Sequence, residues 1–268
     1  MRPIRLAWSP LLLMLLTVGL PPCAQARALE GDALLSAVEG ARARRRAQVR
    51  SVSADVVIGM SSKAWAGSGT CQGRLAARRP GSLRLLGYAA VATVFDATTD
   101  GERFWLYLPP LGRVITGRAT EESLLVALPV LPVEIVSALF GEPYGAPESG
   151  LRVIASGGAS WIAWNLPDGH EVRARYDASS LLLERAELWA GEERVARLDY
   201  HDYRKRRGVW WPTRVEFDWP EERGHLSLTF DQVRFNGKID DSAFRFEAPE
   251  GVMVTSVTDP DPFGEKSR

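Results

Sequence analysis

A chain of 268 residues with 33 Lys and Arg against 33 Asp and Glu has no basic excess. It therefore lacks the charge that binding to a nucleic-acid backbone requires, and we expect no nucleic-acid partner. Hydrophobic residues make up 46% of the chain, which is enough for a sizeable core and excludes general disorder.

The N-terminus has the pattern of a secretory signal peptide over residues 1–26. A basic start and a short apolar run, Leu11–Leu20, precede an Ala-x-Ala cleavage pattern that ends at Ala26. The run is short for a membrane span. We expect export to the periplasm and a mature chain that starts at Arg27.

Cys23 leaves a second hypothesis open. A cysteine just after an apolar run is a candidate lipidation site, which would make the protein an outer-membrane lipoprotein. Pro22 stands where lipoprotein signals usually have a small residue. Cleavage after Ala26 would leave Cys71 as the remaining cysteine and exclude an internal disulfide. We predict that Cys71 is a small buried residue on a strand and not a catalytic thiol.

Residues Leu29–Gln48 predict an amphipathic helix, because Leu34, Leu35, Val38 and Ala41 recur at helical spacing. Arginines gather toward its C-terminal end, where they suit the helix dipole. Two interpretations remain for Arg42, Arg44, Arg45 and Arg46: a solvated helix end, or a contact with anionic lipid headgroups.

From Val49 onward, apolar residues alternate with polar ones, as in Val52, Ala54, Val56 and Ile58. Pro80-Gly81 breaks one extended stretch, and Asp100-Gly101 predicts a hairpin turn. Alternation resumes after Gly150. We predict a mainly β fold, a half-open antiparallel β-barrel or strongly curved sheet, as one domain over residues 27–257 with a flexible tail at 258–268.

Residues Thr120–Gly141 interrupt the strands. The segment has helical start and stop signals, is apolar on nearly every side, and is broken by Pro129 and Pro132. A helix of this kind must be buried or must cover an apolar surface. Two alternatives stay open: a permanent part of the core, or a broken helical lid over the concave face of the sheet. A lidded hollow would suit lipid tails, since each buried methylene contributes about 0.8 kcal/mol.

The sequence contains no recognisable catalytic or metal-binding motif. His170, His201 and His225 have no metal-ligand spacing, and no nucleophile elbow or phosphate-binding loop is present. We predict no enzyme activity, no metal and no cofactor. Trp210 and Trp211 are adjacent on a predicted strand, so at least one indole should face outward.

Three motifs in order resemble the outer-membrane lipoprotein carrier superfamily (LolA/LolB-like). They are the stretch that ends in Arg79-Pro80, the Asp-Gly turn before "ERFWLYLPP", and the closing "DDSAFRFEAPEGV". "LFGEPYG" is similar to the LolB side of the superfamily. The "RKRRGVWWPTRVEFDWPEE" region and the two lid prolines depart from the best-known carriers.

The resemblance implies a periplasmic carrier that holds acyl chains of lipoproteins or lipids in a hydrophobic cavity. It also implies that Arg79 helps to hold the lid shut. An inner-membrane transporter and an outer-membrane receptor would be the protein partners, and we expect a monomer. The alternative is an anchored, LolB-like receptor or structural lipoprotein lipidated at Cys23. The residues that we predict to line the cavity and lid are Val56, Ile58, Leu83, Leu85, Phe104, Leu106, Leu124, Leu125, Leu128, Leu131, Ile135 and Leu139.

Overall fold

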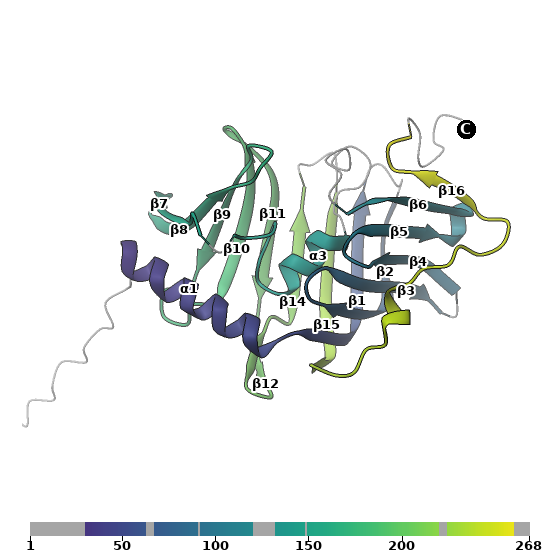
Figure 1. The fold of residues 1–268 in the computed structure, drawn as a ribbon, viewed down its shortest axis with the longest axis horizontal. Helices are drawn as coiled ribbons and strands as arrows, with labels where there is room; N and C mark the ends of the chain where they lie inside the picture. The colour runs from purple at the N-terminus through teal and green to yellow at the C-terminus, as the bar shows by residue number, and fades with distance from the viewer. Residues whose placement is uncertain are drawn as a thin grey trace, which may run out of the picture.

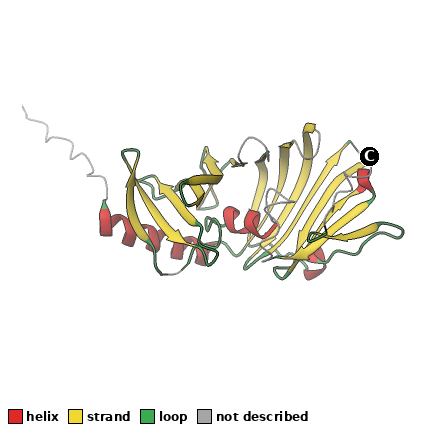
Figure 2. Ribbon diagram, turned by 90° about the horizontal axis from the view of Figure 1, so that it is seen from above, coloured by secondary structure: helices red, strands yellow, loops and turns green. Residues whose placement is uncertain are grey.

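The computed structural model describes residues 30–62, 67–90, 92–119, 132–147, 149–219 and 224–259. In these ranges the chain forms a long curved sheet, a separate two-stranded hairpin and two helices (Figures 1 and 2). The helices are α1, Gly31–Gln48, and α3, Pro132–Leu139. Single 3-10 turns, η1 and η2, cover Pro109–Leu111 and Asp241–Phe244.

The first half of the sheet comes from the N-terminal part of the chain. Its strands are β1 Ser51–Ser62, β2 Gly67–Arg78, β3 Ser82–Ala89, β4 Ala92–Thr99, β5 Arg103–Leu108 and β6 Arg113–Arg118. The second half and the hairpin contain β7 Arg152–Ser156, β8 Ala159–Asn165, β9 Glu171–Tyr176, β10 Leu183–Ala190, β11 Glu193–His201, β12 Arg204–Arg206, β13 Val209–Trp211, β14 Arg214–Asp218 and β15 His225–Phe235. The last strand, β16 Met253–Ser256, returns to the first half and pairs with β6.

The strand order is β16-β6-β5-β4-β3-β2-β1-β15-β14-β11-β10-β9-β8-β7, and β12 pairs with β13 in the hairpin. Every pairing is antiparallel except that of β16 with β6, which is parallel. This corrects the expectation of a wholly antiparallel sheet. The strong curvature is confirmed, but β16 and β7 form two open edges, and the described strands do not close into a barrel.

Alternation decides which side of each strand faces the core. On β1, Val52, Ala54, Val56 and Ile58 are all buried, whereas Val57 on the other side is 36% exposed. Successive residues of a strand point to opposite faces, so a period-two apolar pattern gives the sheet one apolar face. We call this the inner face, and the opposite side the outer face.

The two predicted breaks are confirmed as turns. Pro80-Gly81 joins β2 to β3 through a cis Arg79–Pro80 bond, and Asp100-Gly101 joins β4 to β5. The Asp100 carboxylate accepts the backbone N–H groups of Glu102 and Arg103 at 2.9 and 2.8 Å. Gly101 has a φ of +104°, a conformation that favours glycine.

The closing segment differs from a simple strand. Phe244 ends the η2 turn and is 2% exposed, while Phe246 packs its ring 6.0 Å from that of Tyr107. The chain then returns to the sheet as β16 beside β6. Phe244 and Phe246 therefore pack from a loop and not from a strand, because the 3-10 turn interrupts the extended backbone.

The N-terminal helix is confirmed, as α1 begins at Gly31 and ends at the predicted Gln48. It buries Leu34 and Val38, contacts β7, and crosses the β7–β11 half of the sheet (Figure 1). Of the predicted broken helix at 120–141, the second piece is α3, whereas residues 120–131 lie outside the described residues.

Candidate functional site

The structure brings the predicted strand residues together on the inner face. Each of them is at most 7% exposed, and all belong to one apolar cluster with Ile135 and Leu139 of α3. They are Val56, Ile58, Leu83, Leu85, Phe104 and Leu106. Leu124, Leu125, Leu128 and Leu131 lie outside the described residues, as does Cys23.

Large and small side chains alternate in rows across this face. In one row, Leu83 pairs with Thr99, which pairs with Phe104. In the next row, Leu85 and Leu106 flank Ala97 in the same way. The face is therefore uneven and mostly apolar, and the hydroxyl of Thr99 in these rows accepts a hydrogen bond from the backbone N–H of Gly101.

Gly73 leaves the space in which the side chain of Ile58 lies against the sheet. A Cβ at Gly73 would lie 2.5 Å from Cδ1 of Ile58 and 2.6 Å from the carbonyl oxygen of Leu86. Any larger residue at Gly73 would push Ile58 off the inner face. This position explains part of the glycine-rich approach to Arg79-Pro80 that the sequence shows.

Helix α3 covers part of the inner face by contacting β3 and β4. Ile135, Val136 and Leu139 are 3% exposed or less and pack into the common cluster. The Tyr200 hydroxyl, which comes from β11, donates a 3.1 Å hydrogen bond to the carbonyl of Ala138. A Cβ built on Gly81 would lie 3.6 Å from Cγ2 of Val133, so the start of α3 lies beside the β2–β3 connection.

Arg79 lies in the turn between β2 and β3, and its side chain contacts the C-terminal end of α3. Its Nη2 donates to the carbonyl of Phe140 at 3.3 Å, and its Nη1 forms a 2.5 Å ion pair with Glu142. Its Nε donates to the carbonyl of Val49, where α1 passes into β1. The guanidinium also lies 4.5 Å from the Phe140 ring centroid. Arg79 thus joins α3, the β2–β3 turn and the end of α1.

Three arginines of α1 hold the same segment, Leu139–Pro147. Arg42 is 9% exposed and donates to the carbonyls of Ala146 and Pro147 at 3.0 and 3.1 Å. Arg46 pairs with Glu142 at 2.8 Å. Arg45 donates to the carbonyl of Leu139 at 3.5 Å and, outside this segment, to the carbonyl of Trp210 at 2.9 Å. A solvated helix end, one of the two interpretations for these arginines, is therefore wrong for Arg42, Arg45 and Arg46, whereas Arg44 is exposed.

We call Arg42, Arg46, Arg79 and Glu142 the arginine clamp. Sequence reasoning found only Arg79, through a family resemblance. Arg42 and Arg46 were visible as helical arginines, and Glu142 was visible in "LFGEPYG". No local signal indicates that they meet, because Arg42 and its acceptor Ala146 are 104 residues apart.

Buried tyrosines lie beside the clamp. Burial raises the pKa of Tyr176 to about 12, although the positive charges of Arg42 and Arg45 oppose the shift. Burial also raises the pKa of Tyr200 well above its usual value. Both phenols are therefore neutral at physiological pH, and Tyr200 donates its hydroxyl proton to the Ala138 carbonyl.

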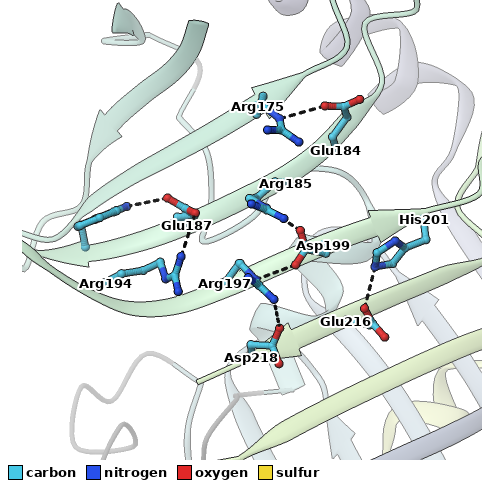
Figure 3. A network of polar contacts seen from close by, with 11 residues as sticks. Arg175, Glu184, Arg185, Glu187, Arg194, Arg197, Asp199, His201, Glu216 and Asp218 are labelled. Atoms are coloured by element: carbon cyan, nitrogen blue, oxygen red, sulfur yellow. Dashed lines mark hydrogen bonds and ion pairs between the residues drawn. The ribbon is translucent and has the colours of Figure 1, made fainter. Parts of the chain in front are cut away.

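The outer face of the second half carries a ladder of paired charges (Figure 3). Arg197 bridges Asp199 at 2.7 Å and Asp218 at 2.8 Å, and Asp199 also accepts from Arg185 at 2.6 Å. Burial alone would raise the pKa of Asp218, but hydrogen bonds from His225 and Arg197 outweigh it and lower the pKa. These charges are paired with one another across neighbouring strands, so the ladder helps to hold the strands together.

The three histidines fit the interpretation of satisfied side chains. Nε2 of His201 lies 2.7 Å from a carboxylate oxygen of Glu216, and Nδ1 of His225 lies 2.8 Å from a carboxylate oxygen of Asp218. His170 forms a pair with Asp168. Over the described ranges, no cluster of His, Cys, Asp and Glu has the arrangement of a metal site. Cys71 is half-buried on β2, and burial raises the pKa of its thiol, which makes it a poorer nucleophile.

A groove of about 570 Å³ opens on the outer face of the first half, around the β1–β15 irregularity. Arg74, Arg84 and Arg234 line it together with Asp55. It lies on the opposite side of the sheet from the predicted acyl-chain residues. None of the described helices is long and apolar enough to cross a membrane.

Comparison with solved structures defines the fold. A DUF1329 family protein from Desulfovibrio piger aligns with a TM-score of 0.55 at 13% identity, covering 78% of this chain and 96% of that one. A lipoprotein-sorting protein domain from Vibrio parahaemolyticus gives 0.53 at 14% identity, covering 78% and 94%. A LolA superfamily protein from Nitrosomonas europaea gives 0.52 at 11% identity, covering 78% and 97%.

The chain therefore has a LolA-like fold, as the three sequence motifs predicted. No protein-family model matches the sequence, and no curated protein matches it either.

Proposed function

We propose that this protein is a periplasmic, non-enzymatic carrier that binds acyl chains of lipoproteins or lipids against its inner face and transfers them toward the outer membrane. The observation that supports this most directly is the covered apolar face. A continuous set of apolar side chains on β1, β3 and β5 forms one cluster with α3, which contacts β3 and β4 and which the arginine clamp fastens at one end.

The chemistry of the contacts suits opening and closing. Apolar side chains of α3 gain free energy from burial against the sheet, and an acyl chain in the same place would give a similar gain of about 0.8 kcal/mol per methylene. An acyl chain can therefore replace α3 on the inner face with little net loss. The polar contacts of the arginine clamp then set the ratio of covered to open protein.

In this mechanism Arg79 and Glu142 stabilise the covered state. Breaking their ion pair, whose side chains are each 16% exposed, would favour the open state. A shift of about 1.4 kcal/mol would change the ratio of open to covered protein about tenfold. Leu128 and Leu131, which the sequence places in the lid, would provide apolar cover over the bound chain.

Uptake of a fluorescent fatty-acid analogue tests the function. Arg79→Ala should take up the analogue about tenfold faster than the parent, by the population argument above. Arg78→Ala is the matched control, because Arg78 is adjacent and pairs at the surface with Asp241, which is 73% exposed. Leu128→Asp and Leu131→Asp should lower loading more than stability.

Extraction of the protein from its native envelope gives an independent result. Lipids or an acylated peptide recovered from the purified protein would support the carrier proposal. An empty protein that also fails to take up the analogue, in parent and Arg79→Ala alike, would overturn it.

A further inference from the structure

The β12–β13 hairpin carries a concentration of unpaired positive charge. Between Tyr203 and Thr213 the chain has four cations and no acidic residue. They are Arg204, Lys205, Arg206 and Arg207. None of the four has an ion pair or side-chain hydrogen bond with a described residue, whereas the arginines on neighbouring β10, β11 and β14 have carboxylate partners.

An exposed tryptophan lies among these cations. Trp210 is 46% exposed, and it is the aromatic member of the large exposed hydrophobic residues in the described part of the chain. Lys205 is its direct partner in the hairpin register, so the two side chains share one face. The adjacent Trp211 is 1% exposed, which confirms that the two indoles face opposite sides.

The base of the hairpin is anchored firmly, so the outward position of Trp210 is built into the fold. Trp211 packs its ring 5.2 Å from that of Phe235 and 6.0 Å from that of Phe230. Arg45 lies 5.3 Å from the Trp211 ring and donates to the Trp210 carbonyl. The hairpin projects from one edge of the molecule, beside the C-terminal end of α1 (Figure 1).

The tip has the geometry of a tight, defined turn. Arg207 and Gly208 have φ values of +49° and +85°, as expected for a two-residue hairpin loop with both central residues in the left-handed region. Arg204, Lys205, Arg207 and Trp210 are all exposed. The charges are thus presented together on a short, regular scaffold and not spread along a disordered tail.

We infer that the β12–β13 hairpin is a membrane-docking element that binds the surface of a bilayer containing anionic phospholipids. Lysine and arginine close to such a surface are attracted to the lipid phosphates, and tryptophan favours the headgroup boundary with its apolar ring inward and its N–H in water. The unpaired cations attract the protein to the anionic lipid surface, and the ring of Trp210 inserts at the headgroup boundary. This goes beyond the proposed carrier function, because it assigns a separate surface to membrane contact.

Vesicle flotation tests the inference with a chain that starts at Arg27 and keeps every described residue. The predicted signal segment is left out because its apolar run would itself bind vesicles. The parent should float with vesicles of phosphatidylcholine mixed with phosphatidylglycerol and much less with phosphatidylcholine alone. Added salt should weaken the binding, because salt screens exposed charges.

Neutralising the hairpin should abolish most of this binding. The triple variant R204Q/K205Q/R207Q should lose about fivefold in partition for each cation, the equivalent of about 1 kcal/mol, and on the order of a hundredfold in total. Trp210→Ser should weaken binding with the charges intact. The matched control is R74Q/R103Q/R234Q, which removes three exposed arginines outside the hairpin and should bind as the parent does.

Three outcomes would overturn the inference: a parent that does not bind mixed vesicles, a hairpin variant that binds them as well as the parent, or a control variant that loses binding equally. An envelope protein captured through the hairpin without vesicle binding would also overturn it and would assign the surface to protein recognition. Fatty-acid uptake measured without vesicles separates the two proposals, since the hairpin variants should retain it.

Discussion

Helix α1 and the β12–β13 hairpin are joined by the hydrogen bond from Arg45 to the Trp210 carbonyl, but the arginines of the two elements differ in what surrounds them. Arg42 is buried and donates to two backbone carbonyls, and Arg46 pairs with Glu142. Arg204, Lys205 and Arg207 are exposed and have no partner among the described residues.

This difference in surroundings corresponds to two different roles of a positively charged side chain. A buried guanidinium without partners would be costly, so an arginine inside the protein must donate to carbonyls or carboxylates, and it then holds segments together. An exposed cation needs no partner and costs little. A cluster of such cations contributes little to folding and remains available for an external anionic surface.

The largest effect should come from Arg42→Ala. Two carbonyls at Ala146 and Pro147 would lose a charged donor, and hydrogen bonds to charged groups contribute about 1.5–3 kcal/mol each, so we expect a loss of about 3 kcal/mol in unfolding free energy. Urea denaturation measures it. Arg44→Ala, on an exposed position of the same helix, should change stability by less than about 0.5 kcal/mol. Equal losses in the two variants would contradict the assignment of Arg42.

The clamp ion pair should give the next largest effect. A double-mutant cycle on Arg79→Ala and Glu142→Ala should show a coupling free energy of about 1 kcal/mol, since both side chains are largely buried and directly paired. The same cycle on Arg78 and Asp241 should give less than about 0.5 kcal/mol, because that pair is exposed. Coupling that is no stronger at Arg79 than at Arg78 would remove the reason to treat Glu142 as part of the clamp.

A smaller effect is expected from acid. Hydrogen bonds from Ser179 and Ser180 lower the pKa of Asp177 to about 2 from an ordinary value of 3.8. A lowered pKa stabilises the fold above the unfolded-state value, and this contribution is lost as the pH falls from 3.8 toward about 2. Asp177 is partly exposed, and solvent screens its interactions, so the contribution should stay below about 1 kcal/mol. Asp177→Asn should flatten the fall in stability over this pH range, and an unchanged slope would contradict the assignment.

The smallest effect on folding should come from the hairpin. R204Q/K205Q/R207Q should leave the unfolding free energy within about 0.5 kcal/mol of the parent, because these side chains have no described partner to lose. Thermal and urea unfolding measure it. A loss of several kcal/mol in unfolding free energy would mean that the hairpin cations stabilise the fold. They would then not differ from Arg42 in this respect.

Much of the fold could be predicted from local patterns. Alternation on β1 marked Val52, Ala54, Val56 and Ile58 as one face, and all four are buried. The turn at Asp100-Gly101 and the helix that ends at Gln48 were also visible in the sequence. By contrast, Met253 and Val254 gave no sign that β16 would pair in parallel with β6, because pairing between segments more than a hundred residues apart leaves no local pattern.

The sequence by itself determined the strands, the turns and the apolar face, because backbone conformation and side-chain direction depend on neighbouring residues. Only the tertiary structure decided which arginines are clamped and which are free. Arg42 finds its carbonyls, and Arg79 finds Glu142, only after strand order and sheet curvature have brought distant segments together. The hairpin arginines remain unpaired for the same reason, since the fold brings no described carboxylate, not even the nearby Asp202, within ion-pairing distance of them.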